Sequence, residues 1–443
     1  MNKAILDYTN EIFADLKANK ADFEKQINYI KNSTAKYHGR VVRTLAIPKV
    51  FDSDTVDDFR RISETTHTIL TKVIHQYLID EDFRKYFGFE PKLSELIITD
   101  AKYDCLLPVA RVDIFYNEET GDFKFCEINT DGSSAMNEDR ELNNALKVTN
   151  VYNRLKDKHG FTSFEFFDSF VKDFEDIYSS YKNKKEKPNV AIVDFLDHGT
   201  VNEFEQFRLA FEKAGYNCEV IDIQDLLYRD GQLISPSGMK IDAIYRRAVT
   251  CDIMDNIDKV NAFISAVKDN AVCLVGSFRT QVAHSKILFK VLSQSDLLSF
   301  LTNEERAFVN KHFPKTYELK SDSALFDLNE VYKNKNSWII KPVDSYASYG
   351  VHAGVECKTD EEWFNYVNEG IDNGYILQEF VTPYITKNTD FENEYSCSNL
   401  TGLFLYNGKF RGIYSRVSKT EIISTQYSEM TLASVICKEK DRD

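Results

Sequence analysis

The stretch FKFCEINTDGSSAMNEDR, residues 123–140, carries oxygen-bearing side chains at alternate positions of its first half. These side chains are Glu127, Asn129 and Asp131. Because successive side chains of a β-strand point to opposite faces of the sheet, residues at alternate positions share one face. The stretch therefore predicts a strand that gathers oxygen atoms on a single face.

The run before it, ARVDIFYN at residues 110–117, alternates in the same manner and supplies Arg111 and Asp113. The turn-like sequence EETGD, residues 118–122, joins the two runs. Short alternating runs linked by a Gly-containing turn are typical of a β-hairpin. We therefore expect two adjacent strands that direct their polar side chains to one face.

Around this hairpin the chain divides into segments of different character. Residues 1–98 are predicted to be mostly helical, and residues 99–181 hold the hairpin before returning to helix. Residues 188–280 follow the basic connector KNKKEKPN and alternate strands with helices, which indicates an open α/β domain with a parallel sheet. Residues 281–443 begin with a helical stretch and become rich in strands. The predicted fold class is α/β (α+β).

Composition excludes several classes of protein. The 443 residues include 55 Lys and Arg against 70 Asp and Glu, and the resulting net charge of −15 repels nucleic-acid backbones. No stretch reaches the roughly 18 uninterrupted apolar residues of a membrane span, and the N-terminal helix lacks the apolar core of a signal peptide. The eight cysteines are dispersed without a CxxC pair, as expected of reduced thiols. We expect a cytoplasmic protein without nucleic-acid or membrane partners.

Three features in the second half of the chain suit a nucleotide. Lys341 ends the apolar strand SWIIKP, and the small, polar loop DSYASYG follows it. A lysine there can reach phosphate oxygens while the loop closes over them. Lys286 begins an apolar helix, and YILQEFV places Gln378 and Glu379 at a strand end. Each feature alone has an ordinary interpretation, as a solvated lysine, a turn or a strand end; their order along the chain favours nucleotide binding.

That order resembles the nucleotide clamp of ATP-grasp ligases. In most of that superfamily the magnesium-binding Asp and E-x-N follow the hinge, whereas here the D…E-x-N match lies upstream of the lysines. The arrangement resembles the circularly permuted branch typified by the synthetase domain of glutathionylspermidine synthase. The R-x-D of ARVDIF, the loop TDGSSA and the arginine of YNGKFRGIYSRVS agree with that branch. The likeness spans roughly residues 100–437, although the loop at residues 344–349 is poorer in glycine than most ATP-grasp loops.

The resemblance implies a Rossmann-like domain ahead of the ATP-grasp part, with ATP and Mg²⁺ as cofactors. It implies a ligase that joins a small-molecule or peptide carboxylate to an amine or thiol through an acyl phosphate. Its magnesium-binding part would be residues 99–181 and its nucleotide clamp residues 281–443. The residues that the resemblance assigns to the nucleotide are Lys286, Lys341, Ser345, Ser348, Gly350, Gln378 and Glu379.

The resemblance also implies a chemical role for the oxygen atoms of residues 123–140. Magnesium prefers near-octahedral oxygen ligands, which Asp113, Glu127 and Asn129 can supply. Arg111 and Arg416 are then candidate catalytic residues that face the charge developed during transfer. The alternation in GIYSRVS predicts that Arg416 points away from the core, whereas Arg411 is expected to be solvated. The alternative hypothesis is that Glu127 and Asn129 form a hydrogen-bonded strand end.

Candidate substrate-binding residues are Ser133, Ser134 and Arg247. The two serines could equally cap the following helix ahead of Glu138. Arg247 follows Arg246 at the end of a strand of the α/β domain, where ligands tend to bind; the equal alternative is that these two adjacent arginines form salt bridges on the surface. For the whole chain, the alternative to a ligase is a nucleotide-binding relative without turnover. An acid-rich metal-binding protein would leave the lysines and the hinge unexplained.

Overall fold

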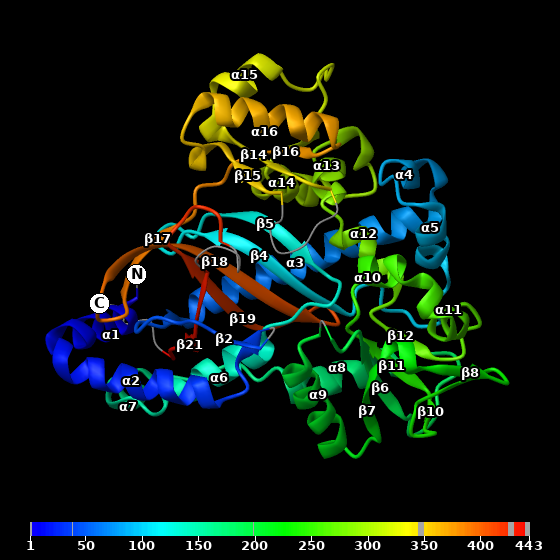
Figure 1. Cartoon of the computed structure of the whole chain (residues 1–443), viewed down its shortest axis with the longest axis horizontal. Coiled ribbons are helices and arrows are strands. Elements are labelled where there is room, and N and C mark those ends of the chain that lie inside the picture. The colour runs from blue at the N-terminus through cyan, green and yellow to red at the C-terminus, as the bar shows by residue number, and fades with distance from the viewer. Residues whose placement is uncertain (1, 38, 198, 344–349, 424–428, 439–443) are drawn as a thin grey trace.

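A large antiparallel sheet occupies the middle of the molecule (Figure 1). The computed structural model describes residues 2–37, 39–197, 199–343, 350–423 and 429–438. The sheet has the strand order β20-β19-β18-β4-β5, and β17 also pairs with β18. Its strands are β4 (Val109–Tyr116), β5 (Phe123–Asn129), β17 (Ile385–Thr389), β18 (Glu394–Tyr406), β19 (Lys409–Ser418) and β20 (Met430–Leu432).

The predicted hairpin is confirmed as β4 and β5, which pair antiparallel. Its turn is held by Asn117, whose amide donates to the carbonyl of Asp122 and whose side chain accepts from the amides of Glu119 and Thr120. Gly121 adopts a positive φ of 75°, a conformation that residues with a side chain rarely take. The turn chemistry of EETGD therefore fixes the register of the two strands.

The long helix α3 (Ser53–Ile79) covers one face of the large sheet. Asp52 caps its N-terminus by accepting a hydrogen bond from the amide of Thr55. Its apolar side packs in one core with Val112, Ile114 and Ile128 of the hairpin. The N-terminal segment also contributes β3 (Lys49–Phe51), which pairs parallel with β21 (Ser434–Ile436) near the C-terminus. The opposite face of the hairpin is left for its polar side chains.

A four-stranded parallel sheet of order β12-β11-β6-β7 forms the predicted Rossmann-like unit within the described residues. Helices α8 (Phe167–Ser179) and α9 (Val201–Lys213) pack on one side of it, and α10 (Thr250–Asp255) and α11 (Asn261–Lys268) on the other. A small ribbon of β8 (Leu227–Arg229), β9 (Gln232–Ile234) and β10 (Lys240–Ile241) adjoins α11. The four parallel strands are β6 (Val190–Asp194), β7 (Cys218–Asp222), β11 (Ala243–Arg246) and β12 (Cys273–Val275).

A smaller antiparallel sheet of order β13-β16-β14-β15 forms the upper lobe in Figure 1. Its strands are β13 (Thr316–Glu318), β14 (Trp338–Lys341), β15 (His352–Ala353) and β16 (Ile376–Glu379). Helices α15 (Leu328–Lys333) and α16 (Asp360–Asp372) cover one face, where Ile340 and Leu377 pack around Trp363. The other face carries Lys341 and Gln378.

The remaining helices surround these sheets. Near the N-terminus, α1 (Lys3–Ala14) and α2 (Leu16–Asn32) pack with α6 (Met136–Leu146) and α7 (Asn150–His159) in one cluster. Short strands β1 (Lys36–Tyr37) and β2 (Arg40–Val41) pair beside them. The others are α4 (Glu81–Lys85), α5 (Pro91–Ile98), α12 (Gln281–His284), α13 (Ile287–Leu292) and α14 (Asn303–His312).

The structure is thus a mixed α/β protein with several sheets, as the sequence predicts. The large sheet combines strands from two of the predicted segments, residues 99–181 and 281–443. The predicted helical portion at residues 1–98 packs against the same sheet through α3. The proposed division into four domains remains a prediction.

Candidate functional site

The polar side chains of the hairpin lie on one face of the large sheet. In the register of β4 and β5, Arg111 pairs with Asn129 and Asp113 pairs with Glu127. Directly opposed residues of an antiparallel pair share a face, so these four side chains converge. The alternating residues Val112, Ile114 and Ile128 point into the buried core instead. The alternation seen in the sequence therefore produces the predicted gathering for Glu127 and Asn129, whereas Asp131 lies beyond the end of β5 and pairs with Arg246 instead.

A β-bulge shifts the register beside this cluster. Asp113 pairs with Glu127, but the next residue, Ile114, pairs with Phe125, which leaves Cys126 as the extra residue. A bulge bends its strand locally and re-aims the neighbouring side chains. The bulge allows Phe125 to stay in the core while Glu127 remains on the polar face.

Asp113 is the centre of the cluster and is fully buried. Arg111 donates from Nε to Oδ1 at 2.8 Å and from Nη2 to Oδ2 at 3.0 Å. Asn129 donates from Nδ2 to Oδ2 at 3.1 Å and to Oε1 of Glu127 at 3.1 Å. Arg416 donates to the same Oδ2 of Asp113. One carboxylate therefore holds two guanidinium groups and an amide.

Arg416 comes from β19, with strand β18 between it and β4. Its Nη2 is also 3.6 Å from Oε1 of Glu127, and its Nη1 is 3.5 Å from Oε2 of Glu429. The guanidinium carbons of Arg111 and Arg416 lie 5.4 and 5.7 Å from the ring centre of Tyr414. Arg416 thus faces the polar cluster, as the alternation of its strand predicts.

The pKa values of the two carboxylates in the cluster, Asp113 and Glu127, are shifted in opposite directions. Burial raises the pKa of Asp113, against the opposing effects of Arg111 and Arg416. Burial also acts to raise the pKa of Glu127, but Arg416 and its other neighbours outweigh burial and lower that pKa well below its ordinary value. The side chain of Glu127 is 42% exposed, whereas that of Asp113 is 0% exposed. Glu127 is therefore an ionised carboxylate that remains open to a ligand.

The oxygen-bearing side chains of this cluster match the ligands of a hard cation such as magnesium only in part. Among the described residues, no group of three His, Cys, Asp or Glu side chains is placed to hold a metal ion. With Asp113 and Glu127 as two oxygen ligands, the third would be the side chain of Asn129. Its amide nitrogen now donates to both of those carboxylates. Rotation of that amide would present its oxygen instead. Glu127 and Asn129 suit magnesium, whereas Asp113 is already engaged by three donor groups.

The second part of the site lies on the small sheet. Lys341 donates from Nζ to Oε1 of Gln378 at 2.8 Å, and Gln378 donates from Nε2 to the hydroxyl of Thr316 at 2.8 Å. These side chains come from β14, β16 and β13, which are neighbours in the sheet. The face opposite α15 and α16 therefore carries a polar line that ends in an ammonium group.

Three other residues predicted to contact a nucleotide lie within the described part of the chain. Glu379 lies beside Lys315, the residue before β13, and its carboxylate accepts from the amide of Lys315 at 2.9 Å. Gly350 has a φ of 68°, and a Cβ there would meet the hydroxyl of Tyr375 at 2.8 Å. Lys286 immediately precedes α13 and is partly buried. Ser345 and Ser348 lie outside the described residues.

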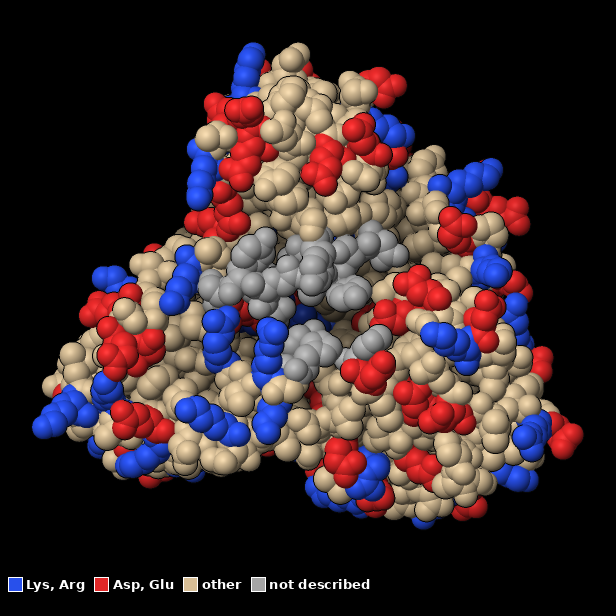
Figure 2. All heavy atoms as spheres, viewed as in Figure 1, with Lys and Arg blue, Asp and Glu red and all other residues tan. Residues whose placement is uncertain are grey.

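Charged groups from both parts of the site influence the thiol of Cys126. Burial raises the pKa of the Cys126 thiol to about 12, while the ammonium of Lys341 opposes that rise and the carboxylate of Glu127 adds to it. A lysine of the small sheet and a carboxylate of the large sheet therefore both act on one thiol. Figure 2 shows acidic and basic side chains interspersed over this side of the molecule. Attraction for an anion must therefore come from local groups such as Lys341.

The loop that follows β5 is held by arginines. Arg111 donates to the carbonyl of Ser134 at 2.9 Å, and Arg247 donates to the carbonyl of Ser133. The hydroxyl of Ser133 donates to the carbonyl of Asn129 at 2.7 Å. Arg247 also pairs with Glu203 at 2.9 Å and is 3% exposed, so the alternative of a surface ion pair is wrong. These residues now shape the loop; their role toward a substrate remains a prediction.

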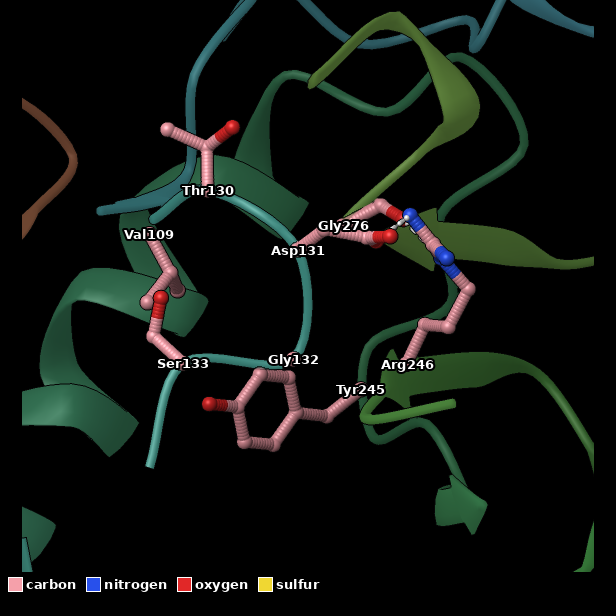
Figure 3. A pocket seen from close by; sticks show the side chains of 8 residues that line it. All are labelled: Val109, Thr130, Asp131, Gly132, Ser133, Tyr245, Arg246 and Gly276. Atoms are coloured by element: carbon pink, nitrogen blue, oxygen red, sulfur yellow. Dashed lines mark hydrogen bonds and ion pairs between the residues drawn. The ribbon is translucent and has the colours of Figure 1, made fainter. Parts of the chain in front are cut away.

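An enclosed cavity lies behind the same loop (Figure 3). Its lining includes Thr130, Asp131 and Ser133 of the loop and Tyr245 and Arg246 of β11. Asp131 and Arg246 form an ion pair of 2.7 Å, and both side chains are 1% exposed. The cavity volume is about 10 Å³, which is room for about one water molecule. The cavity is therefore too small to hold a substrate.

Three residues that shape this site were not predicted from the sequence. Cys126 is the extra residue of a bulge, which alternation alone cannot reveal. Glu429 pairs with Arg416 from the start of β20, and Gly402 lies on β18 beneath the Asp113 cluster. Gly402 stands within a long apolar strand, and a glycine in a strand interior is a known signal for close approach of another group.

The comparisons with known proteins concern the fold. No protein-family model matches the chain, and no curated protein matches it in sequence. The structure is similar to that of a glutathione synthetase-like effector, GSS30, from Globodera pallida in its apo form, with a TM-score of 0.58 and 11% identity over 93% of this chain and 96% of that chain. The chain therefore has a synthetase-like fold. No described helix is long and apolar enough to cross a membrane.

Two further structures are less similar. A protein assigned as a gamma-glutamylcysteine synthetase in Methylobacillus flagellatus KT has a TM-score of 0.43 and 10% identity over 84% of this chain and 88% of that chain. The D-cycloserine synthetase DcsG has a TM-score of 0.26 and 12% identity over 57% of this chain and 93% of that chain. We therefore base no argument about the fold on these two structures.

Proposed function

We propose that this chain is an ATP- and magnesium-dependent ligase of the circularly permuted ATP-grasp type, similar to the synthetase domain of glutathionylspermidine synthase. It joins a carboxylate to an amine or a thiol through an acyl phosphate. The observation that carries the proposal is the cluster on the large sheet, where Asp113, Glu127 and Asn129 share one face with two arginines. The proposal places a cation for phosphate, Lys341 of the small sheet, beside this cluster, and the electrostatic effect of both Lys341 and Glu127 on the Cys126 thiol supports it.

In this proposal the small sheet holds the nucleotide. Lys341 contacts phosphate oxygens through its ammonium group, and Gln378 orients that ammonium by accepting its hydrogen bond. Lys286 and Gly350 border the phosphates, and Glu379 lies at the adenosine end. Ser345 and Ser348 belong to the same proposed contact set on the basis of the resemblance.

The large sheet holds the metal and the reacting carboxylate. Glu127 and Asn129 would bind magnesium, with Asp113 as the third ligand that the resemblance implies. When bound, magnesium neutralises charge on the transferred phosphoryl group. Arg111 and Arg416 keep two fixed guanidinium groups beside this position, where negative charge develops during transfer. Ser133, Ser134 and Arg247 would orient the acyl substrate.

The proposed reaction has two steps. A carboxylate oxygen of the substrate attacks the γ-phosphorus, the bond to the bridging oxygen breaks, and ADP leaves. The nitrogen of the amine then attacks the acyl carbon, phosphate leaves, and the nitrogen loses a proton to solvent or to a nearby base. Both steps need water to be excluded between the two sheets.

A second candidate is a nucleotide-binding relative without ligase turnover, with a regulatory or scaffold role. Asp113 favours it, because Arg111, Arg416 and Asn129 already engage both of its oxygens. A carboxylate has about four acceptor positions, so these four hydrogen bonds leave little capacity for a metal. The protein with the similar fold is itself described as an effector.

Phosphate release from ATP and magnesium, measured against pools of carboxylic acids and amines, separates the two candidates. A ligase releases phosphate only when an acid and an amine are both supplied. Lys341→Ala should abolish that release, and Lys335→Ala serves as the matched control because Lys335 pairs with the exposed Asp360 instead. ATP binding without release in any pool would favour the binding protein, and absence of ATP binding would refute both.

A further inference from the structure

Gly402 lies on β18 at the point where the charged cluster crosses that strand. It pairs with Asp113 of β4 on one side and with Tyr414 of β19 on the other. A Cβ at Gly402 would stand 2.8 Å from Oδ1 of Asp113 and 3.0 and 3.2 Å from Cδ and Cγ of Arg111. The first distance is shorter than real Cβ contacts, and the others are tight. The space above Gly402 is therefore filled by the cluster itself.

Backbone conformation does not require glycine at this position. The φ angle of Gly402 does not lie in the positive region, and at this residue β18 pairs regularly with both of its neighbouring strands. An alanine could therefore adopt the same backbone, and only the missing side chain matters. A glycine also weakens a strand interior relative to residues with a side chain, so its presence here calls for a reason.

We propose that Gly402 is a positioning residue for the candidate active site. Its missing side chain leaves the space in which Asp113 holds Arg111 and Arg416 together, on opposite sides of β18. This role adds a positioning residue to the site of the proposed function. Of the two experiments below, only the measurement of Mn²⁺ and ATP binding rests on that function.

The neighbours have little room to yield to a larger residue. Asp113 is 0% exposed, and both its oxygens are fixed by Arg111, Asn129 and Arg416. A methyl group at position 402 would displace the carboxylate and weaken its contact with Arg416. That arginine already lies 3.6 Å from Oε1 of Glu127 and 3.5 Å from Glu429, so it would turn to those carboxylates. Glu127 would then be neutralised by an arginine and would lose affinity for a cation.

Gly412 provides the matched control. It lies on the neighbouring strand β19, opposite Phe404, and is likewise absent from the positive-φ glycines. A Cβ there would collide with the ring of Phe166, a core residue without a role in the cluster. Gly412→Ala should therefore lower the melting temperature by overpacking alone.

The first experiment is a double-mutant cycle on thermal stability, which needs no ligand. Gly402→Ala should lower the melting temperature in the wild-type chain by several degrees. In an Asp113→Ala background the same change should cost less, because the closest contact of the methyl group, with Oδ1 of Asp113, is then absent. If Gly402→Ala alone fails to fold, recovery of folding in the double variant supports the proposal. An equal loss in both backgrounds, or no recovery, would overturn it.

The second experiment measures binding of Mn²⁺ in place of magnesium, and of ATP without metal. Gly402→Ala should weaken Mn²⁺ binding at least tenfold and leave metal-free ATP binding unchanged, whereas Gly412→Ala should change neither. Equal Mn²⁺ affinities for Gly402→Ala and wild type would overturn the positioning role. Failure of the wild type to bind Mn²⁺ or ATP would count against the proposed function instead, and the thermal cycle would still decide the role of Gly402.

Discussion

Lys341 and Gln378 are joined by a hydrogen bond of 2.8 Å although 37 residues separate them in the chain. The antiparallel pairing of β14 with β16 sets Ile339 against Gln378 and Lys341 against Ile376, so both polar residues share a face. Their buried neighbours Ile340 and Leu377 point to the opposite face, beneath α16. Two features that the sequence suggests separately therefore form one unit.

Replacement of Lys341 by methionine should weaken ATP binding. A hydrogen bond to a charged group contributes about 1.5–3 kcal/mol, so we expect roughly a ten- to hundredfold higher dissociation constant. The chain should still fold, because the apolar stem of methionine can replace that of the partly buried lysine. Titration of ATP by calorimetry measures the change. Lys335→Met, which removes an ion pair with Asp360 and a hydrogen bond to the carbonyl of Cys357, should bind ATP as the wild type does; equal losses at both positions would contradict the assignment.

The hairpin and the strands β14 and β16 of the small sheet could be predicted from sequence because their signals are local. Alternation decides which face each side chain takes, and turn residues fix where the strands reverse. The meeting of Arg416 with Asp113 could not be predicted in the same way. It depends on the strand order β19-β18-β4 and on the absence of a side chain at Gly402, and both are properties of the assembled sheet.

Glu127→Gln and Asn129→Ala should lower metal affinity far more than stability. Glu127 is 42% exposed, and Asn129 is partly buried at the same open edge, so neither change leaves a large cavity. We expect Mn²⁺ binding to weaken on the order of tenfold or more for each, since each removes one oxygen donor. The measurement is a metal titration beside a thermal melt. Retention of wild-type affinity by both variants would identify the pair as a structural strand end.

Arg416→Lys should lower the rate of any phosphoryl transfer on the order of 10²-fold, the size expected for the loss of one preorganised donor. Lysine cannot reach Asp113 and Glu429 at once, because it presents a point charge in place of a planar fork. ATP binding at Lys341 should persist. A steady-state assay of phosphate release tests the rate, and a rate equal to that of the wild type would reduce Arg416 to a structural ion pair.

Arg411 does not behave as the sequence suggests. Its strand position near the YNG turn indicates a solvated side chain, but the structure pairs it with Asp173 through hydrogen bonds of 2.6 and 2.8 Å. Asp173 belongs to α8 and is 1% exposed, so a partner distant in sequence decides the role of Arg411. Alternation along one strand carries no information about a helix that packs against its end.

Arg411→Lys should accordingly lower stability rather than rate. The bidentate contact with a buried carboxylate would become a single one, and the loss is on the order of 1–2 kcal/mol because the lysine still neutralises the charge. The rate per folded molecule should match the wild type. Denaturant unfolding beside the phosphate-release assay separates the two arginines. The opposite result, a rate loss at Arg411 with normal stability, would contradict the placement of both.

Glu138 gives a prediction about pH. It lies in α6 and is 4% exposed, and its Oε2 has no hydrogen-bond partner among the described residues. Burial, together with the nearby carboxylate of Glu203, raises the pKa of Glu138 to about 8, although Arg247 and Arg111 oppose the rise. The folded chain therefore keeps a proton that the unfolded chain loses above the ordinary value of 4.5. Folding stability contributed by this group is lost as pH rises from that value toward 8 and stays level above it.

Glu138→Gln removes this dependence, because the amide has no proton to lose in that range. Near pH 5 the variant and the wild type should be about equally stable, and near pH 9 the variant should be more stable by a few kcal/mol, at about 1.4 kcal/mol per pKa unit. Asp139→Asn is the control: burial raises the pKa of Asp139 to about 7, but its carboxylate accepts from the Ser434 amide and from Asn143, each at 2.9 Å. Because an asparagine offers only one acceptor oxygen for those two donors, that substitution should bring a smaller gain or none. Denaturant unfolding at the two pH values tests both variants, and a Glu138→Gln chain that is no more stable than the wild type near pH 9 would show that the carboxyl group is already ionised and stabilised in the fold.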